Sequence, residues 1–378
     1  MIALYSGQHW IPAPMPTTAD DTVVIAADRL RAFAQTVCSR AGCDAEEAAA
    51  IASHLVDANL TGHDSHGVGM LTDYVPAMRE GRLKLGRRAR VVRDQGPVVV
   101  LDGGIGVGQV LGREAMAIGI ARARQHGVAL VALQRSHHLG RIGAWAEQCA
   151  AAGLVSMHYV NVIGHRTYVA PFGGRDGRLA TNPVCIGLPA TDRPAIILDM
   201  ATSKVAFGKI KVARNKGRPA PEGALLGPTG EPTTDPTVMF AQPMGALLPF
   251  GEHKGYGLAL MCDLLAGALA GGGTNRPETQ VSDTIINSML SIIIDPAALT
   301  NAAGWKAEAD ALCDWVKSSP ARAGFDAVMV PGEPERRMRA ERGRQGIPLD
   351  RNTWQQLLGA ARLAGCKAEE IPEVAPLS

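Results

Sequence analysis

Aromatic side chains make up only 4% of the 378 residues, which leaves no stacking platform for nucleic acid bases. The formal net charge of +2 at pH 7 is also too small for the basic surface of a nucleic-acid-binding protein. No apolar run approaches the length of a membrane span, and the first residues lack the basic segment and apolar core of a signal peptide. We therefore expect a globular protein that has neither nucleic acid nor membrane as a partner.

Cysteine pairs with metal-binding spacing are also missing. The seven cysteines are odd in number and scattered, and no two of them form a CxxC motif. This pattern argues against a zinc knuckle and indicates reduced thiols, so we expect a cytoplasmic protein.

The length of the chain favours two domains, because 378 residues exceed one ordinary hydrophobic core. Helical patterns dominate both ends of the chain, whereas strands and helices alternate in its middle part. We predict an α/β domain over residues 97–334 and a helical domain formed by residues 23–96 together with 335–378. Residues 1–22, which contain three prolines, are expected to form an extended arm.

The densest group of reactive side chains lies in five consecutive residues, His63 to Gly67. They contain two imidazoles, a carboxylate and a hydroxyl, and they follow a helical run over residues 46–59. Histidine titrates closest to neutral pH, so His63 or His66 could exchange a proton with a substrate. The alternative is a polar turn, in which the Asp and the Ser only cap the next helix.

A second histidine cluster, Ser136 to Gly143, follows an apolar strand predicted at Val128–Leu133. His137 and His138 would lie at the carboxyl end of that strand, where α/β proteins place their sites. A strand, a polar loop with glycines and then a helix, here residues 144–152, is an arrangement that suits an anionic ligand. The alternative is a surface loop with incidental histidines.

An acidic residue, Asp199, ends another predicted strand, Ala195–Leu198, ahead of a helix expected from Lys204 to about Ala213. We interpret its carboxylate as the partner of a histidine or of a cofactor amide. Thr202 or Ser203 can cap the helix, and capping is a strong alternative to a functional role for these two residues.

Two further segments stand out. The first is a candidate for anion binding, and the second is predicted to be the last strand. Lys254 lies beside glycines at the start of an apolar helix, Leu258–Leu269, and could hold a phosphate or a carboxylate. A last strand is predicted at Phe325–Val330, followed by Pro331 to Glu335 and a basic helix.

Several well-known sequence motifs are absent from this chain. The glycine run Gly104-x-Gly106-x-Gly108 lacks the GxGxxG spacing of a Rossmann fingerprint, and no acidic ribose partner follows it, so we predict a turn. No P-loop, GxSxG elbow or HExxH metal motif is present. The available groups fit proton transfer to a small polar substrate, with a cofactor for the electron chemistry. The alternatives are a metal-dependent lyase or hydrolase that uses the histidines, and a nucleotide-binding regulator without turnover.

Six segments occur in the order in which the type-2 malate/L-lactate dehydrogenase family has them. They are Gly62–Val68, Ser136–Gly140, Thr181–Pro183, Leu198–Ser203, His253–Gly257 and Pro331–Glu333. The chain resembles that family from about Val23 to Ala364, and the run His137–Cys149 looks most like its hydroxycarboxylate dehydrogenase B branch.

The resemblance implies an α/β fold with a central mixed sheet that is not a Rossmann fold, and usually a homodimer. It also implies an NAD- or NADP-dependent oxidoreductase that interconverts a small 2-oxo acid and its 2-hydroxy acid. By the same resemblance, His66 is the proton donor, His138 matches an acid/base residue of another branch, and Asp199 is the acid near the catalytic histidine. The cofactor contacts implied in this way are His66, Gly140, Arg141, Ile142, Asn182, Ile197, Leu198, Asp199, Met200, Ala201, Ser203, His253, Lys254, Pro331, Gly332, Glu333 and Pro334.

One departure from the family concerns substrate binding. Many members have arginine four residues after the histidine that His66 matches, and this chain has Met70 there. Arg141 could hold the substrate carboxylate instead. In the expected mechanism His66 protonates the oxygen of the 2-oxo acid as hydride reaches its carbonyl carbon. Asp199 would orient the imidazole and favour its charged form.

Overall fold

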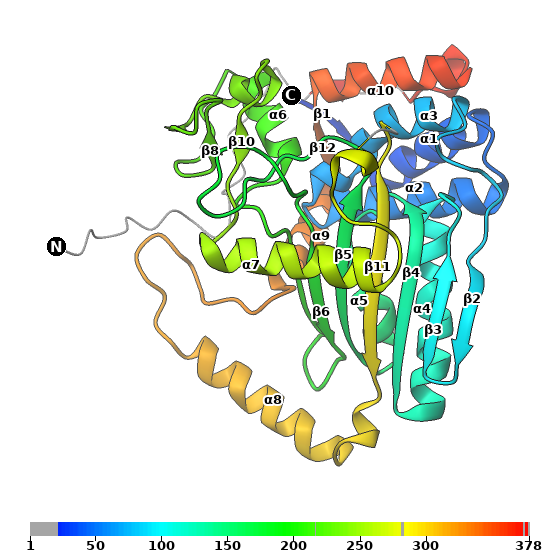
Figure 1. The fold of residues 1–378 in the computed structure, drawn as a ribbon, viewed down its shortest axis with the longest axis vertical. Coiled ribbons are helices and arrows are strands. Elements are labelled where there is room, and N and C mark those ends of the chain that lie inside the picture. The colour runs from blue at the N-terminus through cyan, green and yellow to red at the C-terminus, as the bar shows by residue number, and fades with distance from the viewer. Residues whose placement is uncertain (1–21, 216, 281–282, 373–374, 377–378) are drawn as a thin grey trace.

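A seven-stranded mixed sheet forms the centre of the computed structural model, which describes residues 22–376 apart from 216, 281–282 and 373–374 (Figure 1). Its strand order is β2-β3-β4-β11-β5-β6-β7. Within this sheet only β3 and β4 pair in parallel, and all other neighbours are antiparallel. A Rossmann sheet is mostly parallel, so the fold is a different α/β type, as expected. The strands are β2 (Arg90–Gln95), β3 (Val98–Asp102), β4 (Val128–His137), β5 (Val155–Ile163), β6 (Val184–Leu188), β7 (Ile196–Met200) and β11 (Ile286–Ile294).

Helices cover both faces of this sheet. On one face α4 (Gly108–His126) and α5 (Gly143–Ala151) pack against the strands and form the main α/β core with them. On the other face lies α7 (His253–Cys262), which continues as a π-helix over Asp263–Leu269 (Figure 1). With both faces covered, the interior strands are buried, and the row of backbone groups along β7 marks one edge of the sheet.

The two ends of the chain build one helical unit. Its helices are α1 (Ala27–Arg40), α2 (Ala45–Leu60), α3 (Leu71–Arg79), α9 (Glu333–Gln345) and α10 (Arg351–Ala364). Beside them, β1 (Thr22–Ile25) pairs with β12 (Ile347–Asp350) and with β13 (Ala375–Pro376). A single cluster of buried apolar side chains joins the N-terminal and C-terminal segments. The predicted boundary at residue 96 falls inside the β2–β3 hairpin, because β2 belongs to the central sheet.

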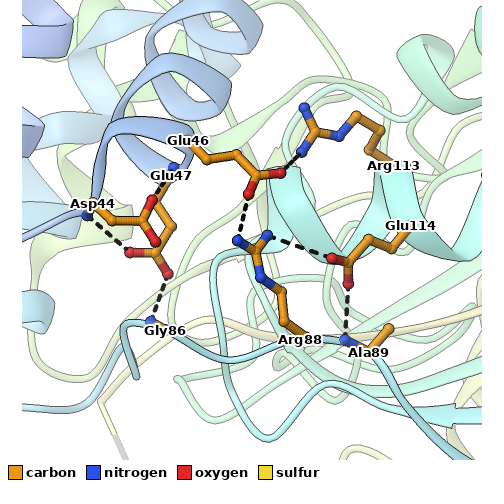
Figure 2. Close-up of polar contacts among 8 residues, drawn as sticks. All are labelled: Asp44, Glu46, Glu47, Gly86, Arg88, Ala89, Arg113 and Glu114. Atoms are coloured by element: carbon orange, nitrogen blue, oxygen red, sulfur yellow. Dashed lines mark hydrogen bonds and ion pairs between the residues drawn. The ribbon is translucent and has the colours of Figure 1, made fainter.

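An ion-pair network attaches the start of α2 to the α/β unit (Figure 2). The carboxylate of Glu46 contacts Arg88 and Arg113, which lie in the connecting segment and on α4. Arg88 also reaches Glu114 at 3.4 Å, and the Glu114 carboxylate accepts a hydrogen bond from the Ala89 backbone N–H at 2.9 Å. The network therefore attaches the N-terminal end of α2, whereas the histidine cluster His63 to Gly67 follows the C-terminal end of this helix.

A small third unit occupies the segment predicted as a long excursion. It contains α6 (Phe207–Asn215) and a sheet of β8 (Leu225–Leu226), β9 (Pro232–Thr233) and β10 (Ala246–Leu247), with its own apolar cluster. Another helix, α8 (Ala302–Lys317), projects from the body of the molecule (Figure 1). Short 3-10 helices complete the fold at Asp64–His66, Val68–Met70, Pro236–Phe240, Pro277–Thr279, Pro296–Ala298 and Ala368–Glu370.

The structure corrects several predicted boundaries. Residues 325–330, all of them described, form no strand. The helix predicted from Val23 begins at Ala27, because the preceding residues pair with β12. The helix predicted from Leu258 begins five residues earlier, at His253. The predicted arm over residues 1–22 lies outside the described residues except for Thr22, which starts β1. Across the described chain, no helix combines the length and apolarity that crossing a membrane would require.

Candidate active site

The loop that follows α2 is shaped by a buried amide. The Asn59 side chain donates a hydrogen bond to Asp64 Oδ1 at 2.6 Å and accepts one from the Val68 backbone N–H at 2.8 Å. Gly67 lies so close that a Cβ atom there would be 2.3 Å from Asn59 Oδ1. Arg342 on α9 completes the support by donating to both carboxylate oxygens of Asp64. Asp64 therefore has a structural role. The loop that it stabilises carries His66 two residues later.

Two imidazole rings meet between this loop and the end of β4. The rings of His66 and His138 are stacked, with centroids 5.5 Å apart and an interplanar angle of 18°. Burial lowers the pKa of His66 to about 4, although the Asp199 carboxylate acts to raise it. Burial also places the pKa of His138 well below its ordinary value. Both rings are therefore neutral near pH 7 and are available as proton acceptors or hydrogen-bond donors.

His138 is anchored from behind by two side chains that the sequence did not indicate. The Tyr74 hydroxyl on α3 is hydrogen-bonded to His138 Nδ1 at 2.6 Å. The Gln109 amide on α4 donates to the Tyr74 oxygen at 3.1 Å and to the His138 carbonyl at 3.3 Å. A Cβ atom on Gly108 would lie 2.1 Å from the same carbonyl, so only glycine fits there.

The other histidines of the two clusters have separate partners. His137 is the last residue of β4, where its buried ring is hydrogen-bonded to Thr284 Oγ1 at 3.2 Å. His63 is hydrogen-bonded to Glu335 on α9 at 3.3 Å. The structure thus separates His66 and His138, which face each other, from two histidines engaged elsewhere.

The loop after β4 is held by another histidine, His54 on α2. Its Nε2 accepts a hydrogen bond from the Arg141 backbone N–H at 2.8 Å, and its ring stacks on Trp145. Gly140 adopts a φ of 74°, in the left-handed region that favours glycine. The Arg141 side chain is buried and forms an ion pair with Glu147.

Asp199 lies within β7 rather than after its end, which corrects the predicted position. Its carboxylate accepts a hydrogen bond from the Gly143 backbone N–H at 2.7 Å, at the first turn of α5. Asp199 is thus hydrogen-bonded to the N-terminus of α5, and it influences the pKa of His66 electrostatically. Thr202 and Ser203 do not cap α6, because that helix starts at Phe207 and their hydroxyls donate to other carbonyls.

A cleft of about 170 Å³ opens beside Asp199, between β7, α5, the end of α2 and the start of α9. Arginine and carboxylate side chains line it in similar numbers. Its lining residues are Thr61, Arg141, Glu147, Pro194, Ala195, Ile197, Asp199, Gly332, Glu335, Arg336 and Arg339.

Several segments with predicted cofactor contacts lie along β7. At one end the Ile197 backbone N–H donates to the Pro331 carbonyl at 3.4 Å, and Gly332 precedes α9 with a φ of 91°. At the other end Ser203 bridges to Pro249 in the turn that leads into α7. His253 and Lys254 are exposed in the first turn of α7.

The remaining predicted residues have varied surroundings. Ile142 precedes α5 and packs in the α/β core. Leu198, Met200 and Ala201 are half-buried on or just after β7. Glu333 and Pro334 form the first turn of α9, where the Glu333 carboxylate pairs with Lys317 on α8.

Asn182 provides an unusual polar atom. It is fully buried, and its side-chain nitrogen donates to the Ala259 carbonyl at 3.0 Å. Its side-chain oxygen has no hydrogen-bond partner among the residues that the structure describes. A buried acceptor without a donor costs free energy, so a bound group with an N–H would stabilise this position.

Met70 packs against the apolar core of the helical unit. It brings no charge toward His66, so the substrate carboxylate would need another cation. Within the described part of the chain, no three His, Cys, Asp or Glu side chains converge as ligands of a metal ion would.

Known proteins match this chain along most of its length. A model of the malate/L-lactate dehydrogenase family matches residues 25–358. Hydroxycarboxylate dehydrogenase B of Escherichia coli strain K12 is 50% identical over 347 residues, which cover 91% of this chain and 95% of that protein. L-lactate dehydrogenase of Cupriavidus necator is 42% identical over 312 residues, which cover 82% of this chain and 89% of that protein.

A solved structure agrees with these matches. A protein from E. coli, provisionally named a malate/lactate dehydrogenase, superposes with a TM-score of 0.88 at 49% identity, over 92% of this chain and 96% of that one. The family match, the identities and the shared mixed-sheet fold lead to one conclusion. This chain belongs to the malate/L-lactate dehydrogenase family and is an oxidoreductase that acts on CH–OH donors.

Proposed function

We propose that the protein transfers hydride between a small 2-hydroxy acid or 2-oxo acid and a nicotinamide cofactor, NAD or NADP. The observation that carries this proposal is the stacked pair of neutral imidazoles, His66 and His138, together with the Asp199 carboxylate, which lines the cleft and acts electrostatically on the His66 ring. Family membership favours this reaction over the metal-dependent lyase or hydrolase that the histidines alone would allow.

The cofactor is proposed to lie along the edge strand β7, in contact with the segments around Ile197, Gly332 and His253. Two features fit such a group. The side-chain oxygen of Asn182, which lacks a donor among the described residues, suits an N–H group such as that of a carboxamide. At Gly332, which lines the cleft, a Cβ atom would lie 2.8 Å from Arg336 Nη1 and 3.3 Å from the Ile197 backbone nitrogen, so only glycine leaves this wall of the cleft free of a clash. A bound nicotinamide supplies or accepts the hydride.

The proton is assigned to His66. With a pKa of about 4 in the free protein, its ring is neutral and can accept the hydroxyl proton of a 2-hydroxy acid. In the opposite direction the negative carboxylate of a bound 2-oxo acid favours the imidazolium, which then protonates the developing alkoxide. Asp199 supports that charged form electrostatically. We propose that Arg141 binds the substrate carboxylate, because this buried cation lines the cleft. Met70 carries no charge and cannot form an ion pair with the carboxylate.

A second copy of the chain is the proposed partner. Exposed apolar side chains gather on α7 with its π-helix and on α8, which projects from the body (Figure 1). They are Leu260, Met261, Leu264, Leu269, Leu312, Trp315 and Val316. Patches of this kind mark interfaces. Trp315→Asp should shift the mass measured by light scattering from dimer to monomer, and an unchanged mass would remove α8 from the interface.

The cytoplasm is the proposed location, since all seven cysteines are free thiols. The experiment that tests the function is a screen of NADH and NADPH oxidation, followed by absorbance, with glyoxylate, pyruvate, oxaloacetate, hydroxypyruvate and phenylpyruvate. Turnover of at least one acid is expected. Tight cofactor binding without turnover on any acid would indicate a regulator, and chelator-sensitive activity without an absorbance change would indicate a metal enzyme.

A further inference from the structure

We propose that Tyr74 and Gln109 are positioning residues that hold His138 as the neutral tautomer with its proton on Nε2. In this form His138 donates a hydrogen bond to the substrate oxygen, while His66 alone moves the proton. The role in catalysis rests on the proposed function, whereas the tautomer is a property of the free protein.

The orientation of the Gln109 amide starts the argument. One of its side-chain atoms contacts both the Tyr74 oxygen, at 3.1 Å, and the backbone carbonyl of His138, at 3.3 Å. A carbonyl oxygen can only accept a hydrogen bond, so the amide atom that contacts it must be the nitrogen. Gln109 therefore donates to both groups.

The direction of the next hydrogen bond follows from the first. The Tyr74 oxygen accepts from Gln109, so its own proton is free for the contact of 2.6 Å with His138 Nδ1. Tyr74 is fully buried, and burial raises the pKa of its hydroxyl, which therefore keeps its proton. His138 Nδ1 must then be the acceptor, and a neutral ring with an accepting Nδ1 carries its proton on Nε2.

The rest of the surroundings keeps this ring neutral. His138 is stacked on His66 and buried, and this burial holds the pKa of His138 well below its ordinary value. Gln109 lies on α4, Tyr74 on α3 and His138 directly after β4, and all three residues are buried. The ring is thereby fixed in position as well as in protonation.

This arrangement divides the chemistry between the two histidines. In the reduction, hydride adds to the carbonyl carbon, the C=O π pair moves to oxygen, and that oxygen takes the proton of the His66 imidazolium. His138 keeps its proton throughout and stabilises the charge that develops on the oxygen. A single proton and a single hydride are transferred, so no further co-reactant is required.

Nitrogen NMR of the cofactor-free protein tests the tautomer directly. With 15N-labelled histidine, and His138→Gln to assign the signal, we expect a protonated Nε2 and an unprotonated Nδ1 for His138 in the wild type. Gln109→Glu is the decisive variant, because a carboxylate accepts from Tyr74 and reverses the chain. We expect this variant to move the proton to Nδ1. A wild-type signal with the proton on Nδ1, or on both nitrogens at pH 7, would overturn the proposal.

Kinetics tests the role. Tyr74→Phe should lower kcat by about 100-fold, the usual effect of weakening a donor to a developing oxyanion, with little change in the Kd for the cofactor. Tyr159→Phe on β5 is the control for loss of a phenolic hydroxyl and should keep wild-type kcat. If Tyr74→Phe does not fold, Gln109→Glu provides the same comparison. An altered tautomer with unchanged kcat would refute the role, whereas the expected tautomer in a protein that turns over no oxo acid would refute only the proposed function.

Discussion

The side-chain oxygen of Asn59 accepts a hydrogen bond from the backbone N–H of Val68, across the whole loop that carries His66. The same amide donates to Asp64, and Asn59 is only 1% exposed. Asn59 is thus the internal brace of the loop that carries His66.

Removal of this brace should be costly. Asn59→Ala leaves the Val68 N–H buried without its partner, so we expect the free energy of unfolding to fall by about 1–3 kcal/mol. Because His66 then loses its fixed position, kcat should fall more than tenfold, a loss of more than about 1.4 kcal/mol in the transition state. Urea unfolding and steady-state kinetics measure the two effects. Thr36→Ala, on the exposed side of α1, is the control, and equal effects of both variants would contradict the idea of a brace.

Gly140 allows a comparison of steric clash with backbone strain. A Cβ atom at Gly140 would lie 2.2 Å from His54 Nε2, in addition to the cost of a left-handed φ. Gly173 has a similar φ of 81°, but no atom of the described residues lies within 4 Å of the place that its methyl group would take. Gly173→Ala therefore has only the backbone cost of about 1–2 kcal/mol. We expect Gly140→Ala to destabilise more and to weaken cofactor binding, as thermal unfolding and cofactor titration would measure.

A double variant separates the two causes at Gly140. In Gly140→Ala combined with His54→Ala the clashing ring is gone, so the extra destabilisation should shrink relative to the sum of the single variants. Full additivity would show that the ring is not the obstacle.

His66 should be required for turnover but not for cofactor binding. His66→Ala is expected to lower kcat by about 10²–10⁴-fold, the usual contribution of a general acid or base. The Kd for the cofactor, from fluorescence titration, should stay within a few-fold of wild type. His63→Ala is the matched control, since His63 contacts Glu335 instead. A wild-type kcat in His66→Ala would show that His138, and not His66, transfers the proton.

The pH dependence should differ between the two reaction directions. Because the pKa of His66 is lowered to about 4, the free enzyme holds the neutral base above that value, and kcat/KM for 2-hydroxy acid oxidation should fall only in acid. Reduction needs the imidazolium, so its kcat/KM should decrease as the pH rises, by about tenfold per unit. A reduction rate that rises with pH would exclude His66 as the proton donor.

Acid should destabilise the fold through buried neutral histidines. Burial lowers the pKa of His54, His137 and His158 to about 3. These folded-state values lie below the ordinary value of about 6.5, so the unfolded chain binds protons first, and stability is lost as pH falls from about 6.5 toward 3. Each group contributes about 1.4 kcal/mol per pH unit in that window. Urea midpoints at pH 7.5, 6 and 5 should therefore decrease steadily, and midpoints independent of pH would show that the histidines are not buried.

The sequence anticipated the parts of the site that depend on local order. The end of α2 at the first histidine cluster and the end of β4 at the second both follow from apolar periodicity and polar residues at the carboxyl ends. Tyr74 shows where this stops. Tyr74 is buried on α3, but its contact with His138 joins two distant segments and has no local signal in the sequence.

The same limit explains the predictions that were wrong. Residues 325–330 have an apolar pattern that fits a strand, yet no strand of the described chain pairs with them. Ser203 has the residue type of a helix cap, but the chain continues to Phe207 before α6 begins. Conversely, Asn59 and His54 looked like ordinary polar positions on α2, and only the return of the loop and of the β4 end onto that helix gives them their functions.

The pairing of β1 with β12 constrains how the enzyme matures on the ribosome. His66 emerges early, yet the core beneath its loop includes Trp354 and Leu357 of α10, which are translated near the end. The nascent chain must therefore carry an unfinished helical unit with exposed apolar surface until synthesis is almost complete. Messenger truncation or premature release before β12 would yield a chain with an assembled sheet and no working site, and such fragments would be clients for chaperones and proteases.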